Sequence, residues 1–337
     1  MTHRSLAVAA PCLVVGVALF LGYQHDAEPL WPGSQFTVAD RERALRHGLD
    51  FLFAQASRPE VFHDWGHDLL SAFVNLGKTS GDREFSDLAL RMGHERALEW
   101  HREHPRVPAH ADADEIADLV YGYDAAASLG VPDEEMRRAL RAAAARFSAV
   151  DYLGFDPPRE PPPAKDRYDV FQDALIVTYT GDHYGVTLGA HLADVLRWLP
   201  LVHPYPPRSS GEDAYYHSLY TVTHVVYTSN GYNTNRLAPR CFPLEFAYLK
   251  DNFPQAVADR DPETLGEYMD TLQSFGLAPA HPWIRRGVEY LLSVQNPDGS
   301  WGDTGEKDPY VRYHSTWTGL NGIQSFRWGP VLPCAGR

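Results

Sequence analysis

The feature that most constrains the fold is a stretch near the C-terminus, residues 282–302. Pro282 stands where the first-turn proline of a helix would stand. The apolar residues that follow recur at helical spacing: Ile284, Val288, Leu291 and Leu292. The run ends in Asn-Pro-Asp-Gly at residues 296–299, which is typical of a turn, and a lone Trp301 follows between small residues. The stretch therefore predicts a helix that ends in a turn.

The order of residues in this stretch resembles the QW repeat of triterpene cyclases. Arg286 and Gly287 are followed, at the spacing of the repeat, by Tyr290, Leu291, Gln295, Gly299 and Trp301. Residues 308–323, which include His314, resemble the closing helix of such a repeat and also the His-containing segment of protein prenyltransferase β-subunits. Both families are toroids of paired helices. The resemblance, which covers about residues 282–328, therefore implies that fold and leaves the chemistry to be argued from the site.

Length, charge and cysteine content limit the remaining possibilities. A chain of 337 residues suffices for one large domain or two ordinary ones. Its net charge of −14 argues against a nucleic-acid partner, because phosphate binding requires a basic surface. Three cysteines do not make a disulfide framework, although Cys241 and Cys334 could pair.

The N-terminus carries an apolar run, residues 5–22, that contains no charged residue. Arg4 precedes it, and Asp26 and Glu28 follow. Its length is near the lower limit for a spanning helix and long for the apolar part of a signal peptide. The run predicts a signal anchor within residues 1–24 that attaches the protein to the membrane and leaves its globular domain outside the cytoplasm. A cleaved signal peptide is the main alternative, and a buried N-terminal helix is another.

After a linker at residues 25–36, the chain is predicted to be helical. Thr37 is expected to cap the first helix, with Asp40 in its first turn. Further helices are predicted at about residues 60–76, 83–103, 112–129, 133–148, 169–181, 187–200, 213–229, 243–252, 262–275, 282–294 and 313–326. About twelve helices without a convincing strand predict an all-α domain, residues 37–330, built as an (α/α)6 toroid. An α-solenoid is the alternative.

One predicted helix carries a polar face that suits the wall of a central cavity. Helical spacing places five residues on this face: His217, Tyr220, Thr221, His224 and Tyr227. Each polar tip needs a partner, so such a stripe fits a wet or ligand-filled cavity better than a core. We expect Tyr220 and His224 to be catalytic and His217 and Tyr227 to contact substrate. The alternative is a polar face whose groups are all satisfied by a neighbouring helix.

His314 is the second candidate. The resemblance to prenyltransferases implies a zinc ligand in this place, together with an Asp-x-Cys pair on a preceding helix, and this chain has no such pair. His183 and His224 are the expected partners of His314 around a zinc, copper or iron ion. Sixteen histidines also allow such combinations by chance. Without a metal, His314 would act as an acid or base, and Tyr313 and Trp317 would contact substrate.

An acidic segment, Asp-Ala-Asp-Glu at residues 112–115, resembles the Asp-x-Asp-Asp motif of class II terpene cyclases, with Glu115 in the last place. In those enzymes the middle acid protonates an alkene, so the resemblance implies that Asp114 is the catalytic acid. The alternative is an ordinary acidic first turn, which the helix dipole favours.

Two further segments have two interpretations each. His63 and His67 lie four residues apart on a predicted helix and could bind a metal, but a surface or supporting role is the interpretation we favour. The polar, aromatic loop at residues 227–236 either contacts substrate or connects two helices.

Three functions fit these features. The expected one is an enzyme of the terpene cyclase and prenyltransferase class that acts on a small hydrophobic, isoprenoid-like substrate in a His/Tyr-lined cavity, where aromatic faces stabilise cations. An extracytoplasmic location counts against a diphosphate substrate. A His-ligated metalloenzyme or polysaccharide-active toroid is the second function, and a non-catalytic binding toroid is the third. The sequence gives no indication of the oligomeric state.

Overall fold

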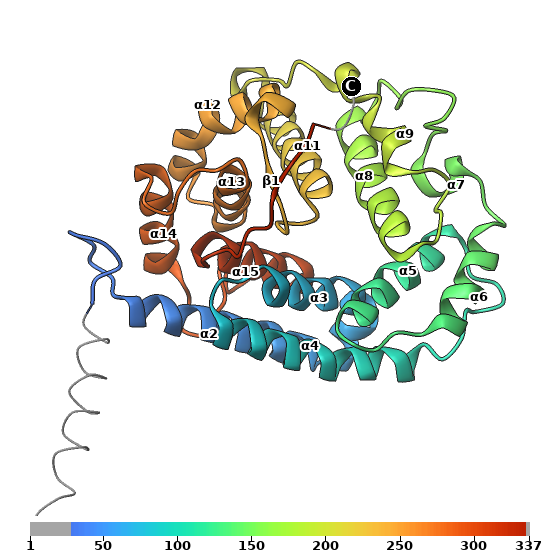
Figure 1. Ribbon diagram of the computed structural model, residues 1–337, viewed down its shortest axis with the longest axis horizontal. Coiled ribbons are helices and arrows are strands. Elements are labelled where there is room, and N and C mark those ends of the chain that lie inside the picture. The colour runs from blue at the N-terminus through green and yellow to red at the C-terminus, as the bar shows by residue number, and fades with distance from the viewer. Residues whose placement is uncertain (1–27, 335–337) are drawn as a thin grey trace, which may run out of the picture.

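The structure, a computed structural model, describes residues 28–334 and is almost entirely helical (Figure 1). Fourteen α-helices and two strands of two residues lie in this range, which confirms the predicted all-α class. The predicted anchor at residues 1–24 lies outside the described residues. Among the helices that are described, none has the length and apolar character needed to cross a membrane.

Most predicted helices are found within a few residues of their expected bounds. The helices are α2 (Val38–Ala56), α3 (Pro59–Thr79), α4 (Arg83–Glu103), α5 (Ala113–Ser128), α6 (Glu134–Ala144), α7 (Ala149–Leu153), α8 (Arg167–Tyr184), α9 (Leu192–Leu196), α10 (Leu199–Val202), α11 (Glu212–Asn230), α12 (Pro243–Asp259), α13 (Pro262–Ser274), α14 (Pro282–Val294) and α15 (Pro309–Ile323). The strands β1 (Arg236–Leu237) and β2 (Val331–Leu332) pair in parallel.

Two predicted helices are wrong in their extent. The helix expected at 187–200 is two short helices, α9 and α10. It starts late because the chain first passes through Gly189 in a left-handed conformation, with φ of 79°. It is divided before Pro200, which has no N–H to continue the hydrogen bonding of α9 and stands in the first turn of α10. The helix expected at 243–252 instead continues through Pro254 to Asp259. At the first helix, the expected cap is confirmed: Thr37 Oγ1 accepts from the Asp40 backbone N–H, and the Asp40 carboxylate accepts from the Thr37 backbone N–H.

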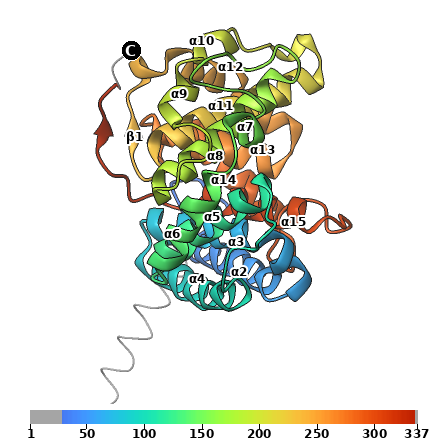
Figure 2. The same cartoon turned by 90° about the vertical axis from the view of Figure 1, so that its right-hand side faces the viewer.

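The packing order of the helices brings the last one back to the first (Figure 1). Helix α3 packs on α4 and α5, α5 on α8, and α8 on α11. Helix α11 contacts α12 and α13, α13 packs closely on α15, and α15 returns to α2 and α3. Figure 2 shows α2, α3 and α4 together at one end of the molecule and α10, α11 and α12 at the other.

The stretch at residues 282–302 joins three helices. Gln295 Nε2 donates to the carbonyl oxygens of Ala44 in α2 (2.8 Å) and Gly299 (3.0 Å). Trp301 is fully buried, and its Nε1 donates to the carbonyl oxygen of Leu291 in α14 at 2.9 Å. A Cβ atom on Gly319 of α15 would lie 2.8 Å from the Trp301 ring, so that glycine makes room for the indole. The stretch therefore holds α2, α14 and α15 together.

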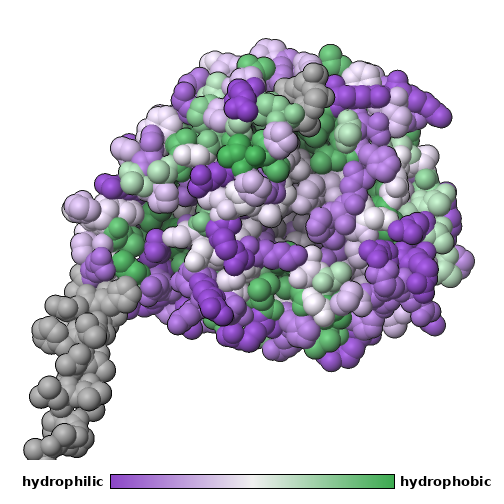
Figure 3. Space-filling view, in the orientation of Figure 1, coloured by the Kyte–Doolittle hydropathy of each residue, from purple (hydrophilic) through white to green (hydrophobic). Residues whose placement is uncertain are grey.

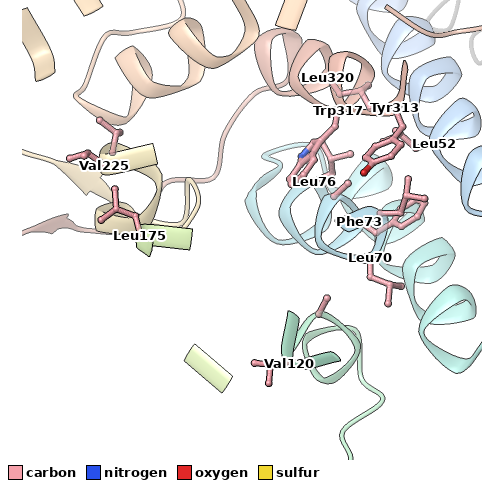
Figure 4. Packing of buried hydrophobic residues seen from close by; sticks show 14 of the residues in the cluster. Leu52, Leu70, Phe73, Leu76, Val120, Leu175, Val225, Tyr313, Trp317 and Leu320 are labelled. Carbon is pink, nitrogen blue, oxygen red and sulfur yellow. The ribbon is translucent and has the colours of Figure 1, made fainter. Parts of the chain in front are cut away.

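The hydrophobic core continues between α15 and α3. Figure 4 shows Tyr313, Trp317 and Leu320 of α15 beside Phe73 and Leu76 of α3, and all of these side chains are buried. Burial of aromatic and aliphatic surface at this contact is a main source of stability. One face of α15 is thus fixed in the core, and this packing sets the position of the remaining residues of the helix.

The C-terminal segment is attached to the body of the protein. Strand β2 pairs with β1, and Cys241 and Cys334, which the sequence left free to pair or not, form a disulfide with a Cα–Cα distance of 5.2 Å. Gly329 N–H also donates to the carbonyl oxygen of Thr234 at 2.8 Å. These contacts hold the loop that follows α11. Figure 3 shows hydrophilic residues over most of this face of the molecule, with hydrophobic residues gathered in small groups.

Candidate functional site

Two adjoining cavities lie between α3, α5, α8, α11, α13 and α15. The outer cavity, of about 230 Å³, is bordered by Lys78 and His183, which are both exposed. The inner cavity, of about 140 Å³, is lined by buried or half-buried residues. Both cavities are lined by four of the same residues: Asn75, Tyr121, Tyr232 and Trp317. A small molecule could therefore enter through the outer cavity and reach the inner one.

Beside the inner cavity lies a cluster of two glutamates and a histidine, which we name the Glu–His cluster: Glu263, Glu267 and His314. Glu267 and His314 line the cavity, and Glu263 lies next to them. One ligand-type atom from each of these residues lies within 4.8 Å of the others. Glu263 and Glu267 lie one turn apart on α13, and His314 comes from α15. Gly266 stands between the glutamates, where a Cβ atom would collide with the carbonyl oxygen of Thr318. This glycine lets α15 approach close enough to form the cluster.

The two carboxylates are held in place by neighbouring hydroxyl groups. Tyr220 Oη donates to Glu263 Oε1 at 3.2 Å, and Ser315 Oγ donates to Glu263 Oε2 at 3.0 Å. Thr223 Oγ1 donates to Glu267 Oε2 at 2.7 Å. Tyr220 and Thr223 both belong to α11, the helix with the predicted polar face. These hydrogen bonds orient the carboxylates, as the outer partners of metal ligands do.

The third member of the cluster, His314, is held by an ion pair rather than by a regular hydrogen bond at Nδ1. Nδ1 of His314 lies 3.2 Å from Glu263 Oε1, a distance suited to an ion pair. The geometry is nevertheless out of line for a hydrogen bond, so this buried nitrogen has no hydrogen-bond partner among residues 28–334. A buried polar atom without a partner is costly, and its presence calls for an explanation.

Burial and neighbouring charges shift the pKa values in the cluster. Burial alone would lower the pKa of His314, but the Glu263 carboxylate, aided by Asp68 and Glu267, raises the pKa of His314 to about 9. Burial acts against the Glu263 charge, yet His314 and the hydrogen bonds from Ser315 and Tyr220 lower the pKa of Glu263. Burial raises the pKa of Glu267 to about 7.

The lining of the inner cavity favours positive charge. Among the described residues that line it are Asp68 and Glu267 but no lysine or arginine. His224 lies close to the cluster, and burial lowers the pKa of His224 to about 4, so it is neutral at pH 7. Its Nδ1–H donates to the carbonyl oxygen of Tyr220 at 2.8 Å, which leaves Nε2 as a hydrogen-bond acceptor. The cavity can hold a cation or a cationic intermediate.

Several residues predicted for the site meet at the inner cavity. His224, Tyr227, His314 and Trp317 line it. Tyr227 Oη donates to Asp270 at 2.9 Å, and Trp317 Nε1 donates to Asn75 Oδ1 at 3.0 Å. Tyr220 and Tyr313 do not line the cavity but orient acids of the site. Tyr220 Oη donates to Glu263, and Tyr313 Oη donates to Asp68 at 2.8 Å.

Two other predicted residues, Asp114 and His217, lie apart from the cluster. Asp114 is exposed in the first turn of α5, where Asp112 and Glu115 form a capping box, and it lines neither cavity. The acidic segment is thus accounted for by helix capping. His217 is half exposed and pairs with Asp169 at 2.5 Å. The structure therefore does not place Asp114 or His217 where catalysis or substrate contact was expected.

The expected set of three histidine ligands is not assembled. His183 borders the outer cavity, and its Nδ1 lies 2.7 Å from Asp124 Oδ1. Within residues 28–334, the Glu–His cluster is the group of His, Cys, Asp and Glu side chains whose atoms converge, and neither His183 nor His224 belongs to it. The His63 and His67 pair also does not converge, because His63 is exposed and His67 faces Asp118 at 3.8 Å.

The loop after α11 contributes directly to the cavities, which fits the first interpretation of residues 227–236. Tyr232 lines both cavities and Asn233 lines the inner one, and both adopt positive φ angles, 50° and 67°. Asn75 Nδ2 donates to the Tyr232 carbonyl oxygen at 2.8 Å, and Asn233 Nδ2 donates to Asp270 Oδ2 at 2.7 Å. Strained backbone that is fixed in this way is common at functional sites.

The sequence prediction missed the two glutamates of the cluster. Their spacing, four residues apart on a predicted helix, was the available signal. It also missed Asp68 and Tyr310, which line the inner cavity. Comparisons of the chain with known protein families, with characterised proteins and with solved structures found no match.

Proposed function

We propose that this protein is a metal-dependent enzyme of the α/α toroid class that acts on a small hydrophobic substrate in the adjoining cavities. The observation that carries the proposal is the Glu–His cluster, whose three ligand-type atoms converge beside the inner cavity that Glu267 and His314 line. Among the described residues, Nδ1 of His314 has an ion pair with Glu263 but no regular hydrogen bond. The return of α15 to α2 and α3 supports the toroid. Carboxylates of α13 would take the part of the Asp-x-Cys pair that prenyltransferases place beside their histidine.

The ligand types point to zinc or iron. Glu263 and Glu267 offer oxygen, and His314 offers nitrogen once a bound metal displaces the proton that its pKa of about 9 keeps on the ring at pH 7. Both metals accept such a mixed set. Copper, the third metal expected from the sequence, suits a carboxylate-rich set less well. A bound divalent ion would offset the repulsion between the two buried carboxylates and would polarise an oxygen atom of the substrate.

Residues around the cluster would bind and orient that substrate. Burial raises the pKa values of Tyr232 and Tyr310 above the ordinary range, so both phenols stay protonated and can donate hydrogen bonds. His224 presents Nε2 as an acceptor for a substrate hydroxyl group. The ring of Trp317 lines both cavities and excludes water from the apolar part of the substrate. The substrate that fits is a small apolar molecule that carries an oxygen function.

The disulfide supports a proposal about the compartment of the globular domain. Cys241 and Cys334 are bonded, and such bonds persist in oxidising compartments. We therefore propose that the globular domain lies outside the cytoplasm, attached through the apolar run at residues 5–22. Alkylation of denatured protein without reductant should leave Cys241 and Cys334 unmodified, and labelling of both would contradict the proposed compartment.

Metal analysis tests the enzyme proposal. Purified wild-type protein should contain about one equivalent of zinc or iron. Glu267→Gln, which keeps the shape of the side chain, and His314→Ala should each lose it. Asp68→Asn changes another carboxylate of the same cavity and should keep it, which makes it the matched control. Circular dichroism establishes that each variant is folded. Wild-type protein that takes up no metal, or cluster variants that keep it, would remove the proposal.

A second candidate is a metal-free enzyme that uses the two carboxylates on a saccharide. It is favoured by the opposite shifts at neighbouring acids, because the pKa of Glu263 is lowered and that of Glu267 is raised to about 7. Such pairs divide the acid and base roles in glycoside cleavage. Metal-free wild-type protein that hydrolyses polysaccharide, and loses this activity in Glu267→Gln, would establish this candidate instead.

A further inference from the structure

A third cavity, which we name the peripheral cavity, lies apart from the Glu–His cluster. It has a volume of about 230 Å³ and is bounded by Arg41 of α2, Gln273 of α13, Arg285 of α14 and Gln324 after α15. Trp31, from the segment before α2, also lines it. The described residues around it include two arginines and no carboxylate, although the chain has a net charge of −14. Its electrostatic character is therefore opposite to that of the inner cavity.

Buried polar groups at this cavity lack partners. Gln273 and Gln324 are only 3% and 4% exposed. Nε2 of Gln273 and Oε1 of Gln324 have no hydrogen-bond partner among the described residues, and the same is true of the buried Nε atoms of Arg41 and Arg285. Leaving such groups unpaired costs about 1–3 kcal/mol each. All four atoms belong to residues that line this one cavity.

The polar groups are held in position rather than free to turn away. Gln324 Nε2 donates to Asn321 Oδ1 at 2.8 Å and to Thr79 Oγ1 at 3.3 Å. These two hydrogen bonds fix the amide group, so its Oε1 cannot turn toward the same partners. The guanidinium of Arg285 lies over the ring of Trp31, 5.5 Å from the ring centre. A cavity with fixed donors, one fixed acceptor and apolar walls is typical of a small-molecule site.

We propose that the peripheral cavity binds a small organic carboxylate that also carries an N–H group, such as an N-acyl amino acid. Arg41 and Arg285 would bind the carboxylate, since guanidinium groups match its two oxygens. Gln273 Nε2 would donate to the ligand, and Gln324 Oε1 would accept from its N–H. Ile284 would contact its apolar part. This inference does not depend on the metal centre.

Isothermal titration of the purified full chain with N-acetylglycine tests the site. Wild-type protein should bind one equivalent, and N-acetylglycinamide, which lacks the carboxylate, should bind at least about tenfold more weakly. Arg285→Gln should weaken N-acetylglycine binding about tenfold, and Gln273→Glu should do so through charge repulsion. Arg43→Gln, which changes an exposed arginine of the same helix as Arg41, is the control and should bind like wild type.

The outcomes separate this inference from the proposed function. Glu267→Gln should bind N-acetylglycine as wild type does, whether or not it has lost a metal. Absence of heat up to about 10 mM ligand, or equal affinity in wild type, Arg285→Gln and Gln273→Glu, would overturn the inference. Arg285 is half-buried and its substitution should be tolerated, so that variant decides the matter if Gln273→Glu does not fold.

Discussion

The stretch at residues 282–302 and the inner cavity both bury polar side chains, but the two regions differ in whether those side chains are hydrogen-bonded. In the stretch, Gln295 and Trp301 each reach a backbone carbonyl oxygen. In the inner cavity, the pair Glu263 and His314 stays close without a hydrogen bond between them, and Nδ1 of His314 is unsatisfied among the described residues. Satisfied polar groups contribute to stability, whereas unsatisfied ones mark a place where a ligand is expected. The stretch that is easiest to recognise in the sequence therefore serves stability, and the proposed ligand site lies in the inner cavity.

The largest effect should come from this stretch. Trp301→Ala removes a fully buried indole that contacts α2, α14 and α15, so we expect a loss of about 3–5 kcal/mol in the free energy of unfolding. Denaturant unfolding followed by circular dichroism measures it. The folded fraction should keep its metal, because the residue is not part of the cluster. A Trp301→Ala variant that is as stable as wild type but has lost its metal would show that Trp301 serves metal binding rather than stability.

Chelation should have the next largest effect on stability, and it should act only by removing a metal from the Glu–His cluster. A metal present at about one hundred times its dissociation constant stabilises the folded chain by about 2.7 kcal/mol. EDTA should therefore lower the melting temperature of wild-type protein. The same treatment should leave Glu267→Gln unchanged, since that variant has no metal to lose. Equal shifts in both proteins would show that the ion binds outside the cluster.

The smallest effect should come from a surface contact of the stretch at residues 282–302. Asp298 accepts from Ser300 and pairs with Arg312 at 2.8 Å. Burial acts against its charge, but the Ser300 hydrogen bonds and Arg312 lower the pKa of Asp298. Its side chain is 47% exposed, so solvent screening limits the contribution to less than about 1 kcal/mol.

The pH dependence of this contact has a definite sign. Because the folded-state pKa is lowered, the stability is present above the unfolded pKa of about 3.9 and is lost as pH falls through the folded value. The difference between wild type and Asp298→Asn should therefore be greatest near neutral pH and shrink below about pH 4. Unfolding free energies measured across that range check it, and a difference that grows on acidification would contradict it.

Most of the helical fold could be predicted from the sequence, because apolar spacing, capping residues and turns are local signals. The cap at Thr37 and the helix that starts at Pro282 are examples. The late start of α9 at Leu192 could not, because a left-handed glycine such as Gly189 has no sequence pattern that separates it from other glycines.

The candidate site was predictable only in part. His224 was found because it belongs to a polar face at helical spacing, and His314 because its segment resembles one of prenyltransferases; both line the inner cavity. Glu263 was not, because an acid in the first turn after Pro262 is also typical of an exposed helix start. Glu267, one turn further on, was not found either, because an acid on a helix is more often exposed than buried. What buries them is the contact with α15 at Gly266, which depends on tertiary packing. Asp114 shows the reverse error, since its acidic neighbours serve only to cap α5.

The most direct measurement is anomalous X-ray diffraction from crystals of the purified protein, recorded on both sides of the zinc and iron absorption edges. The account predicts one strong anomalous peak between the carboxylates of Glu263 and Glu267 and a ring nitrogen of His314. An empty map at that position, or a peak at another place in the protein, would contradict it.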